Sequence, residues 1–337
     1  MSILVSAGLP TGMEGLTYPM PFSDPSSLLR IAQHAEKLGY HSVWGNDHMS
    51  TQNYVRAEFP QPPRFWEILT TYAWLAAQTT TLRFGTGILV LPMRRDIVVT
   101  AKQIATLDHL SGGRLEIGVG IGAYREEFEA LWPNSRAHRG DMLEEGVDAL
   151  HTLFSGKDAS FDGKYYKFHN VQFSPKPLQA HLPMYFGGNS PNHVRRVAEA
   201  ADGWIPAGMP ADQLRVLVDR LHEQVVGKGR DPKQVHVAPQ FVVHVGRTKE
   251  AAVGRYRQSQ MCKHLQSLAK STLKDQARIP MEDINLIGDV DTIVARAQTL
   301  KEAGVTHFLG LYFAANDVSE LLDQMQVFAE EVIPRIR

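Results

Sequence analysis

Short runs of β-branched and other apolar residues alternate with longer stretches whose apolar residues recur at helical spacing, from one end of the chain to the other. This alternation predicts parallel strands joined by helical crossovers. Eight strands are expected, at residues 3–9, 42–45, 82–91, 114–119, 183–186, 203–206, 235–245 and 307–311. Eight helices are expected, at residues 25–38, 65–79, 97–110, 138–154, 191–200, 211–226, 290–303 and 318–333. Eight units of each kind predict an α/β fold of the (β/α)8 type, the TIM barrel.

Two stretches are longer than this repeating unit requires. Residues 158–173 alternate aromatic and polar side chains around Asp162 and Gly163, which predicts a β-hairpin. Residues 256–285 have helical spacing and predict a helical insertion. We therefore expect insertions after strands 4 and 7, of the kind that often covers an active site.

The bulk composition narrows the classes of partner. The 337 residues are 43% hydrophobic, enough for one large core, and a single domain spanning residues 1–337 is expected. A formal net charge of −1 without basic or acidic runs gives no broad attraction to phosphate backbones or anionic lipids, so neither nucleic acid nor a membrane is expected as a partner. The only cysteine, Cys262, excludes an internal disulfide framework, and the first residues lack the pattern of a signal peptide. A cytoplasmic location is therefore expected.

The chemistry of a (β/α)8 barrel is placed at the C-terminal ends of its strands. The first strand end lacks the His-x-His pair of a metal-dependent hydrolase, and no metal site is expected. No strand end presents a lysine suited to a Schiff base, and the fourth offers glycine and alanine where a glycosidase would need a carboxylate. These three common barrel chemistries are therefore disfavoured.

A glycine-rich segment follows the expected fifth strand. It consists of Gly187, Gly188, Asn189 and Ser190, and it lies between a strand and a helix. Backbone N–H groups and the positive end of the helix dipole can converge on a phosphate there. The alternative is a tight turn whose glycines only permit positive φ, and the local sequence does not decide between the two.

The ends of strands two and four supply further candidates. Asp47 and His48 form the only acid–base pair at a strand end, and histidine exchanges protons near neutral pH. A lone histidine of this kind is more often structural than catalytic, so the pattern by itself assigns no role. Gly120 and Gly122 lack the spacing of a dinucleotide fingerprint but would let a flat ring approach the backbone, and Arg125 could reach a phosphate or carboxylate.

Seven segments carry a resemblance to a known family: SVWGNDH at 42–48, LRFGTGILVLP at 82–92, LSGGRLEIGVG at 110–120, REEF at 125–128, FDGKYY at 161–166, GGNS at 187–190 and ADGW at 201–204. In their order along the chain they resemble the bacterial-luciferase-like, flavin- and F420-dependent oxidoreductases. The resemblance implies a redox ring over the barrel mouth, against a bulge in strand three that contains a non-prolyl cis peptide at Gly87–Ile88. It also implies that the cofactor phosphate sits at residues 188–190 and that His48 faces the reacting part of the ring.

The resemblance thus adds expected roles to the candidate residues. The expected cofactor-binding residues are Gly87, Ile88, Gly120, Gly122, Arg125, Gly187, Gly188, Asn189 and Ser190, and the expected catalytic residues are His48 and Asp47. The F420-dependent sugar-phosphate dehydrogenases of this family carry a glutamate after the strand-four glycines and a tryptophan shortly after the Asp-His pair, where this chain has Ala123 and Gln52. A sugar phosphate is therefore not expected as the substrate.

Apolar side chains gather in the segment after strand two. They are Met49, Tyr54, Phe59, Phe65 and Trp66, and they would suit an apolar or aromatic organic substrate or simply pack against the barrel.

Three functions fit the resemblance. The leading hypothesis is a monooxygenase that uses O2 and reduced FMN from a separate flavin reductase. The alternative is an F420-dependent hydride-transfer oxidoreductase that uses no O2, and the third is a non-catalytic flavin-binding protein. FMN and coenzyme F420 both remain open as cofactors, and a homodimer is expected because relatives commonly form dimers.

Overall fold

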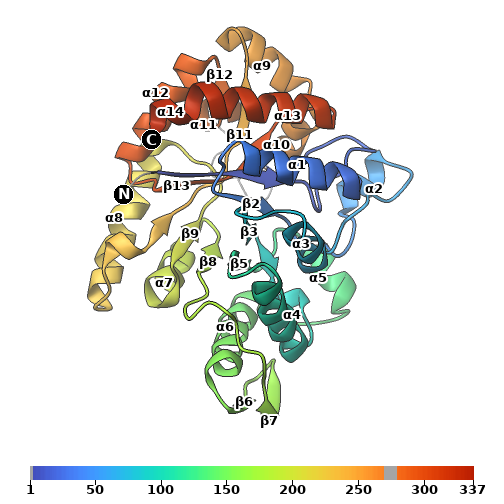
Figure 1. Cartoon of the computed structure of the whole chain (residues 1–337), viewed down its shortest axis with the longest axis vertical. Coiled ribbons are helices and arrows are strands. Elements are labelled where there is room, and N and C mark those ends of the chain that lie inside the picture. Colours follow the sequence, from blue (N-terminus) through green and yellow to red (C-terminus); the bar gives the residue numbers. More distant parts are fainter. Residues whose placement is uncertain (1–2, 269–278) are drawn as a thin grey trace.

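The computed structural model describes residues 3–268 and 279–337, and its centre is a curled parallel sheet with helices around the outside (Figure 1). The neighbouring strands run in the order β10-β9-β8-β5-β3-β2-β1-β13-β11-β12, and the short β4 also pairs with β5. Their bounds are β1 Leu4–Leu9, β2 Ser42–Gly45, β3 Arg83–Thr86, β4 Leu89–Val90, β5 Leu115–Gly120, β8 Met184–Gly187, β9 Gly203–Ile205, β10 His236–Val237, β11 Val242–Val245, β12 Leu286–Gly288 and β13 His307–Phe313. The predicted TIM-barrel fold is confirmed.

The last strand closes the sheet. β13 pairs with β1 on one side and with β11 on the other. The backbone N–H of Thr306 also donates to the carbonyl of Val237, and that of Leu309 to the carbonyl of Pro239. The expected strand at 235–245 is therefore one barrel strand divided into β10 and β11, since Pro239 has no N–H to donate within a ladder. β12, which the sequence did not predict, pairs with β11 outside this closed path.

The expected strand at 82–91 is likewise divided, into β3 and β4. A cis peptide bond joins Gly87 to Ile88 between them, at the place that the family resemblance implied. Two side chains at the end of β2 hold this bulge: Asn46 Nδ2 donates to the carbonyl of Gly87 at 3.2 Å, and Asp47 Oδ2 accepts from the N–H of Val90 at 3.0 Å. The bulge and the end of β2 therefore form one rigid edge of the barrel mouth.

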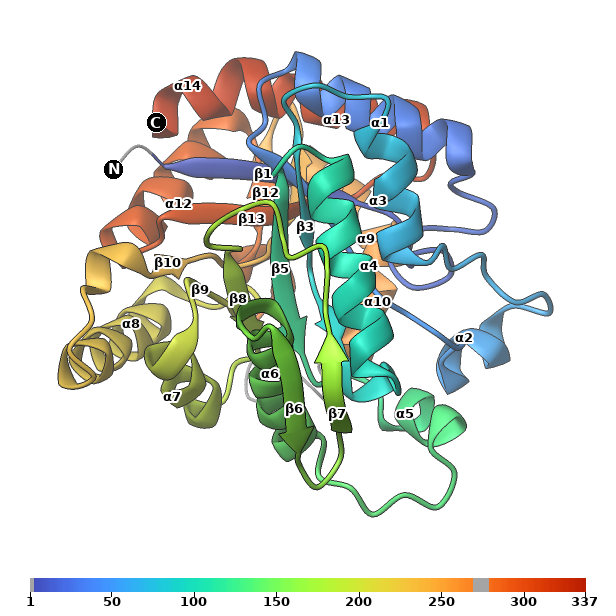
Figure 2. The same cartoon turned by 60° about the horizontal axis from the view of Figure 1, so that its bottom comes forward.

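The helices cover the outer surface of the sheet, as Figures 1 and 2 show. Asp24 caps the first of them by accepting the N–H of Ser27 at 2.8 Å, and Gly39 ends it with a φ of 73°. The barrel helices are α1 Pro25–Lys37, α3 Ile68–Ala76, α4 Ile97–Leu110, α6 Arg139–Ser155, α7 Pro191–Ala200, α8 Ala211–Gly227, α12 Val290–Glu302 and α13 Val318–Val327. The chain then continues through a π-helical turn, Phe328–Val332, into α14, Ile333–Ile336. No helix among residues 3–268 and 279–337 is long and apolar enough to cross a membrane.

Further elements lie between the barrel units. β6 (Asp158–Asp162) and β7 (Lys167–Gln172) form an antiparallel hairpin that follows α6 (Figure 2). The expected helical stretch at 256–285 contains α10 (Gln260–Leu268) and α11 (Met281–Ile284), and its residues 269–278 lie outside the described residues. The remaining helices are α2 Asn53–Glu58, α5 Arg125–Leu131 and α9 Lys249–Arg257. None of these three was predicted as a helix. α2 and α5 have only six and seven residues, too few to establish a helical period, and α9 lies almost entirely before the helical stretch expected at 256–285.

Candidate active site

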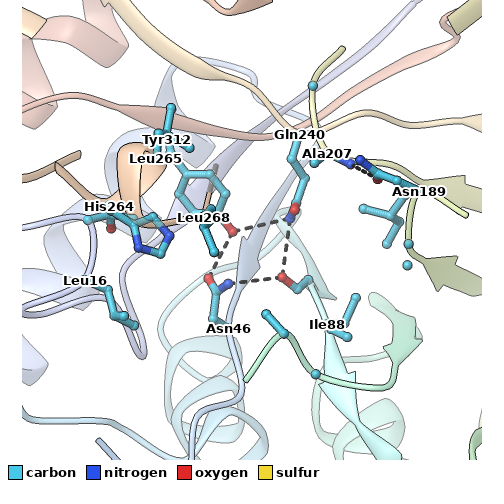
Figure 3. Close-up of a pocket in the computed structure, with 18 of the residues that line it drawn as sticks. Leu16, Asn46, Ile88, Asn189, Ala207, Gln240, His264, Leu265, Leu268 and Tyr312 are labelled. Atoms are coloured by element: carbon cyan, nitrogen blue, oxygen red, sulfur yellow. Dashed lines mark hydrogen bonds between the residues drawn. The ribbon is translucent and has the colours of Figure 1, made fainter. Parts of the chain in front are cut away.

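A cavity of about 650 Å³ opens at the C-terminal ends of the barrel strands. At its floor four groups are hydrogen-bonded to one another (Figure 3). Asn46 and Gln240 both donate to the carbonyl of Gly87, at 3.2 and 3.3 Å, and the hydroxyl of Tyr312 donates to Asn46 Oδ1 at 3.0 Å. Burial raises the pKa of Tyr312, so this hydroxyl keeps its proton. The floor is therefore a pre-organised polar surface beside the Gly87–Ile88 bulge.

His48 lines the same cavity and is held by a buried carboxylate. Its Nδ1 lies 3.0 Å from Oε2 of Glu127, which α5 supplies. Oε1 of Glu127 accepts the N–H groups of Met49 and Ser50, at 2.5 and 3.2 Å. Burial acts to raise the pKa of Glu127, but the hydrogen bonds from His48 and these backbone groups outweigh it and lower the pKa. The amide nitrogen of Gln52 also lies 3.0 Å from Nδ1 and 3.3 Å from Oε2 of Glu127. This amide can donate to Oε2, so we place the ring proton on Nδ1, where it faces the ionised Glu127. Nε2 of His48 is then the ring atom that can exchange a proton.

Asp47 is placed differently from His48. Its carboxylate is buried and pairs with Arg94, whose Nη2 lies 2.6 Å from Oδ1, while Oδ2 accepts the N–H of Val90. Burial raises the pKa of Asp47, and the Arg94 guanidinium opposes that effect. The same Arg94 atom also contacts Glu67 Oε1 at 2.9 Å. Because both oxygens of Asp47 are engaged in this way, its carboxylate links the end of β2 to the end of β4.

The glycine-rich segment after β8 forms the opposite end of the cavity. Gly188 has a φ of 138°, and a Cβ there would lie 2.5 Å from the ring of His193. Asn189 Oδ1 accepts the N–H of Ala207 at 2.8 Å, so its amide group is fixed in orientation. Ser190 is the N-cap residue of α7. The cavity lining includes all four residues of this segment, 187–190, together with His193 of α7.

Two of the expected cofactor-binding residues lie outside the cavity lining. Gly120 lies beneath Ile88, and a Cβ at Gly120 would come within 2.1 Å of Ile88 Cδ1. Arg125 is about three-quarters exposed and pairs with Glu129 at 2.6 Å. Arg139 lines the cavity instead, and its Nη1 donates to the carbonyls of Ile121 and Gly122. The other expected site residues line the cavity, as the sequence analysis predicted. They are Gly87, Ile88, Gly122, Asp47 and His48.

The residues that sequence reasoning missed come from distant parts of the chain. Glu127 belongs to the REEF segment that was noted without a role, and Asn46 stands beside the Asp-His pair. Tyr312 lies one residue beyond the expected end of the last strand, so a longer strand would have included it. Gln240 follows the break in the seventh strand, and no local pattern indicated it.

The outer wall of the cavity is mainly apolar. The aromatic residues that were expected near a substrate pack behind this wall: Tyr54, Phe59 and Phe65 lie against a buried cluster that includes Leu16 and Tyr124. The side chains that line the outer wall are Met13, Leu16, Tyr124, Met261, His264, Leu265 and Leu268.

A family model described as luciferase-like monooxygenase matches residues 1–307. This chain belongs to that family. Over 328 residues it is 27% identical to the F420-dependent glucose-6-phosphate dehydrogenase of Kineococcus radiotolerans, covering 93% of this chain and 94% of that enzyme. The chain is therefore a luciferase-like oxidoreductase, of a family that uses FMN or F420.

Two solved structures illustrate the fold of this luciferase-like family. The monooxygenase RslO1 from Streptomyces bottropensis has a TM-score of 0.82 at 22% identity, covering 99% of this chain and 100% of that chain. An F420-dependent secondary alcohol dehydrogenase, solved with an F420–acetone adduct, has a TM-score of 0.79 at 20% identity and covers 100% of both chains. At these identities the likeness establishes the shared architecture of the family.

Proposed function

We propose that this luciferase-like protein is an F420-dependent oxidoreductase that interconverts an alcohol and a carbonyl group on a small organic substrate. The observation that carries the proposal is His48 in the cavity with Nδ1 held by the buried Glu127. Oxidation of an alcohol removes a hydride from carbon and a proton from oxygen, so the site needs a base beside the substrate hydroxyl. Nε2 of His48 meets that need.

The comparisons favour F420 over the FMN and O2 hypothesis with which the sequence analysis began. Two relatives that match nearly the whole chain are F420-dependent glucose-6-phosphate dehydrogenases. A dehydrogenase also requires an acid–base partner of the kind that His48 and Glu127 form.

The residues at the glycine-rich end fit a phosphate-bearing cofactor. Nδ1 of His193 is buried and has no hydrogen-bond partner among the described residues. Burial lowers the pKa of His193 to about 4, so its ring is neutral near pH 7. Gly188 brings the backbone close to this ring, and the N-terminus of α7, which has no side-chain cap, directs the positive end of the helix dipole toward this end of the cavity. Gly188, Asn189 and Ser190 would therefore hold the phosphate, and the Gly87–Ile88 bulge would support the ring.

F420, when bound, accepts a hydride from an alcohol carbon or returns one to a carbonyl carbon. His48 takes the hydroxyl proton at Nε2, and Glu127 stabilises the imidazolium that results. Asn46, Gln240 and Tyr312 keep the bulge carbonyl of Gly87 in a fixed position. In the reverse direction His48 returns the proton to the oxygen.

A sugar phosphate does not suit this cavity. Arg139 is the only lysine or arginine among its described lining residues, and its guanidinium already donates to two backbone carbonyls. Ala123 stands after the strand-four glycines, and Gln52 is buried beside Glu127 at 3.3 Å. The proposed substrate is therefore an uncharged alcohol or carbonyl compound.

Anaerobic assays with F420 and a panel of secondary alcohols test this function. We expect loss of the visible absorbance of F420 with stoichiometric formation of ketone, no reaction with glucose 6-phosphate, and no activity in His48→Ala. Product formation that requires FMNH2 and O2, with no reaction of F420, would refute the proposal.

A further inference from the structure

A histidine lies in the mainly apolar outer wall of the cavity. α10 contributes Met261, His264 and Leu265 to this wall, and Leu16 faces them from the loop after β1. Figure 3 shows the ring of His264 extending into the cavity from α10. The mechanism described above makes no use of this histidine.

A pair of tyrosine hydroxyls fixes the ring of His264 from behind. The hydroxyl of Tyr54 lies 2.8 Å from Nδ1 of His264, and the hydroxyl of Tyr124 lies 3.4 Å from that of Tyr54. Burial raises the pKa of Tyr54 to about 12 and raises the pKa of Tyr124 as well. Both hydroxyls therefore keep their protons near pH 7. The bond with Tyr124 lowers the pKa of Tyr54 and raises that of Tyr124, which fits Tyr124 as the donor, and we therefore assign the proton of Tyr54 to Nδ1.

The tautomer of His264 follows from this contact. Burial lowers the pKa of His264 to about 3, and the nearby His48 acts in the same direction, so the ring is neutral near pH 7. A neutral imidazole carries one proton, and Nδ1 is already an acceptor, so the proton is on Nε2. The hydrogen bond of the His264 ring to residues 3–268 and 279–337 is made by Nδ1, which leaves Nε2 free to donate to a ligand. A fixed N–H donor therefore lies in a mainly apolar wall, to which Thr17 adds a hydroxyl.

We propose that His264 donates a hydrogen bond from Nε2–H to an oxygen of a largely apolar substrate and thereby selects molecules that carry a carbonyl or hydroxyl group. The cavity then presents a proton acceptor at His48 and a neutral donor at His264. A site built to satisfy a polar group discriminates strongly against analogues that lack it, because the buried donor is then left unpaired. The substrate class is a hydrophobic ketone or alcohol. This inference rests on the proposed function in taking the molecule at this wall to be the substrate.

The tautomer is tested without any ligand, by side-chain 15N NMR of histidine-labelled protein. We assign the His264 signals by their loss in His264→Gln. We expect a neutral ring with the proton on Nε2 from about pH 5 to pH 8. In Tyr54→Phe, which keeps the ring of residue 54, we expect both tautomers to be populated. Protonation of His264 near pH 6.5, or a proton on Nδ1 in the unaltered protein, would overturn the inference.

The donor role is tested by the binding of two probes of similar shape, acetophenone and ethylbenzene, which differ in a carbonyl oxygen. NMR titration should show acetophenone binding about tenfold more tightly than ethylbenzene, the effect of one satisfied hydrogen bond. The preference should fall to about one in His264→Phe, which keeps a planar ring, and recover in part in His264→Gln, which restores an N–H donor. Lys263 lies on the same helix but is exposed and pairs with Glu58, and Lys263→Gln should leave the preference unchanged.

An equal preference in the unaltered protein and in His264→Phe would overturn the inference. Because these probes report binding, their outcome does not depend on which cofactor the protein uses. If the protein reduces F420 but does not prefer the ketone, the role proposed for His264 is wrong and the proposed function stands. If the protein prefers the ketone but does not react with F420, the proposed function is wrong and the hydrogen bond from His264 stands.

Discussion

Glu127→Gln tests how the carboxylate of α5 controls the proton on His48. The substitution keeps the shape of the side chain. Its carbonyl oxygen can still accept the N–H groups of Met49 and Ser50, now bonded to Oε1. The amide NH2 then faces Nδ1 of His48, where two donors would oppose each other. The imidazole avoids this repulsion when its proton is on Nε2 and Nδ1 accepts from the amide. Nε2 then carries a proton and cannot act as the base.

The size of the effect follows from the bond that is lost. A hydrogen bond to a charged group contributes about 1.5–3 kcal/mol. A loss of about 2 kcal/mol in the transition state corresponds to a fall of about 30-fold in kcat. Because Glu127 acts through His48, the double variant His48→Gln/Glu127→Gln should be no slower than His48→Gln alone.

The assay is the single-turnover rate of F420 reduction by a secondary alcohol, and 15N NMR of His48 reports the tautomer without turnover. Glu129→Gln is the matched control, since Glu129 lies on the same helix but is exposed and pairs with Arg125. It should change the rate less than twofold, as expected for a surface ion pair. A kcat for Glu127→Gln within threefold of the unaltered enzyme would refute the reasoning.

Two further predictions concern the cofactor end and the buried histidine at the other end of the barrel. Gly188→Ala should weaken cofactor binding about tenfold or more in fluorescence titration, because a φ of 138° is strained for alanine and the new Cβ would meet His193. Gly254→Ala is the control: its Cβ would meet nothing within 4 Å, and cofactor binding should be unchanged. Burial lowers the pKa of His307 to about 3, whereas the pKa in the unfolded chain is about 6.5. Between these pH values the unfolded chain binds one more proton than the folded protein. The free energy of unfolding should therefore fall as the pH drops below about 6.5. Urea unfolding should show a smaller loss of stability between pH 7 and pH 5 in His307→Gln than in the exposed control His151→Gln, and equal losses would contradict this account.

The barrel could be predicted because its signal is local and repeated. Each strand and helix shows its own spacing of apolar residues, and Asp24 and Gly39 mark their helix ends by their own chemistry. The division of the strand at 235–245 was missed, although Pro239 within it is a known signal of interrupted pairing. β12 was missed because three residues are too few to show a period.

The site was predictable only where one segment carries the chemistry. His48 and residues 187–190 each follow a strand and could be read from their neighbours. The contact between His48 and Glu127 joins residues 79 apart in the chain, and that between Asn46 and Tyr312 joins residues 266 apart. Such pairs depend on how the strands are ordered around the barrel. The pattern of residues along the chain does not show which distant residues come into contact.

The most direct test of the central claim is an anaerobic equilibrium titration of the purified protein with F420 and with FMN, each oxidised and reduced. We expect saturable binding of F420 that is at least about tenfold tighter than binding of FMN and is weakened by Gly188→Ala. Tighter binding of FMN, or binding of neither cofactor, would contradict it.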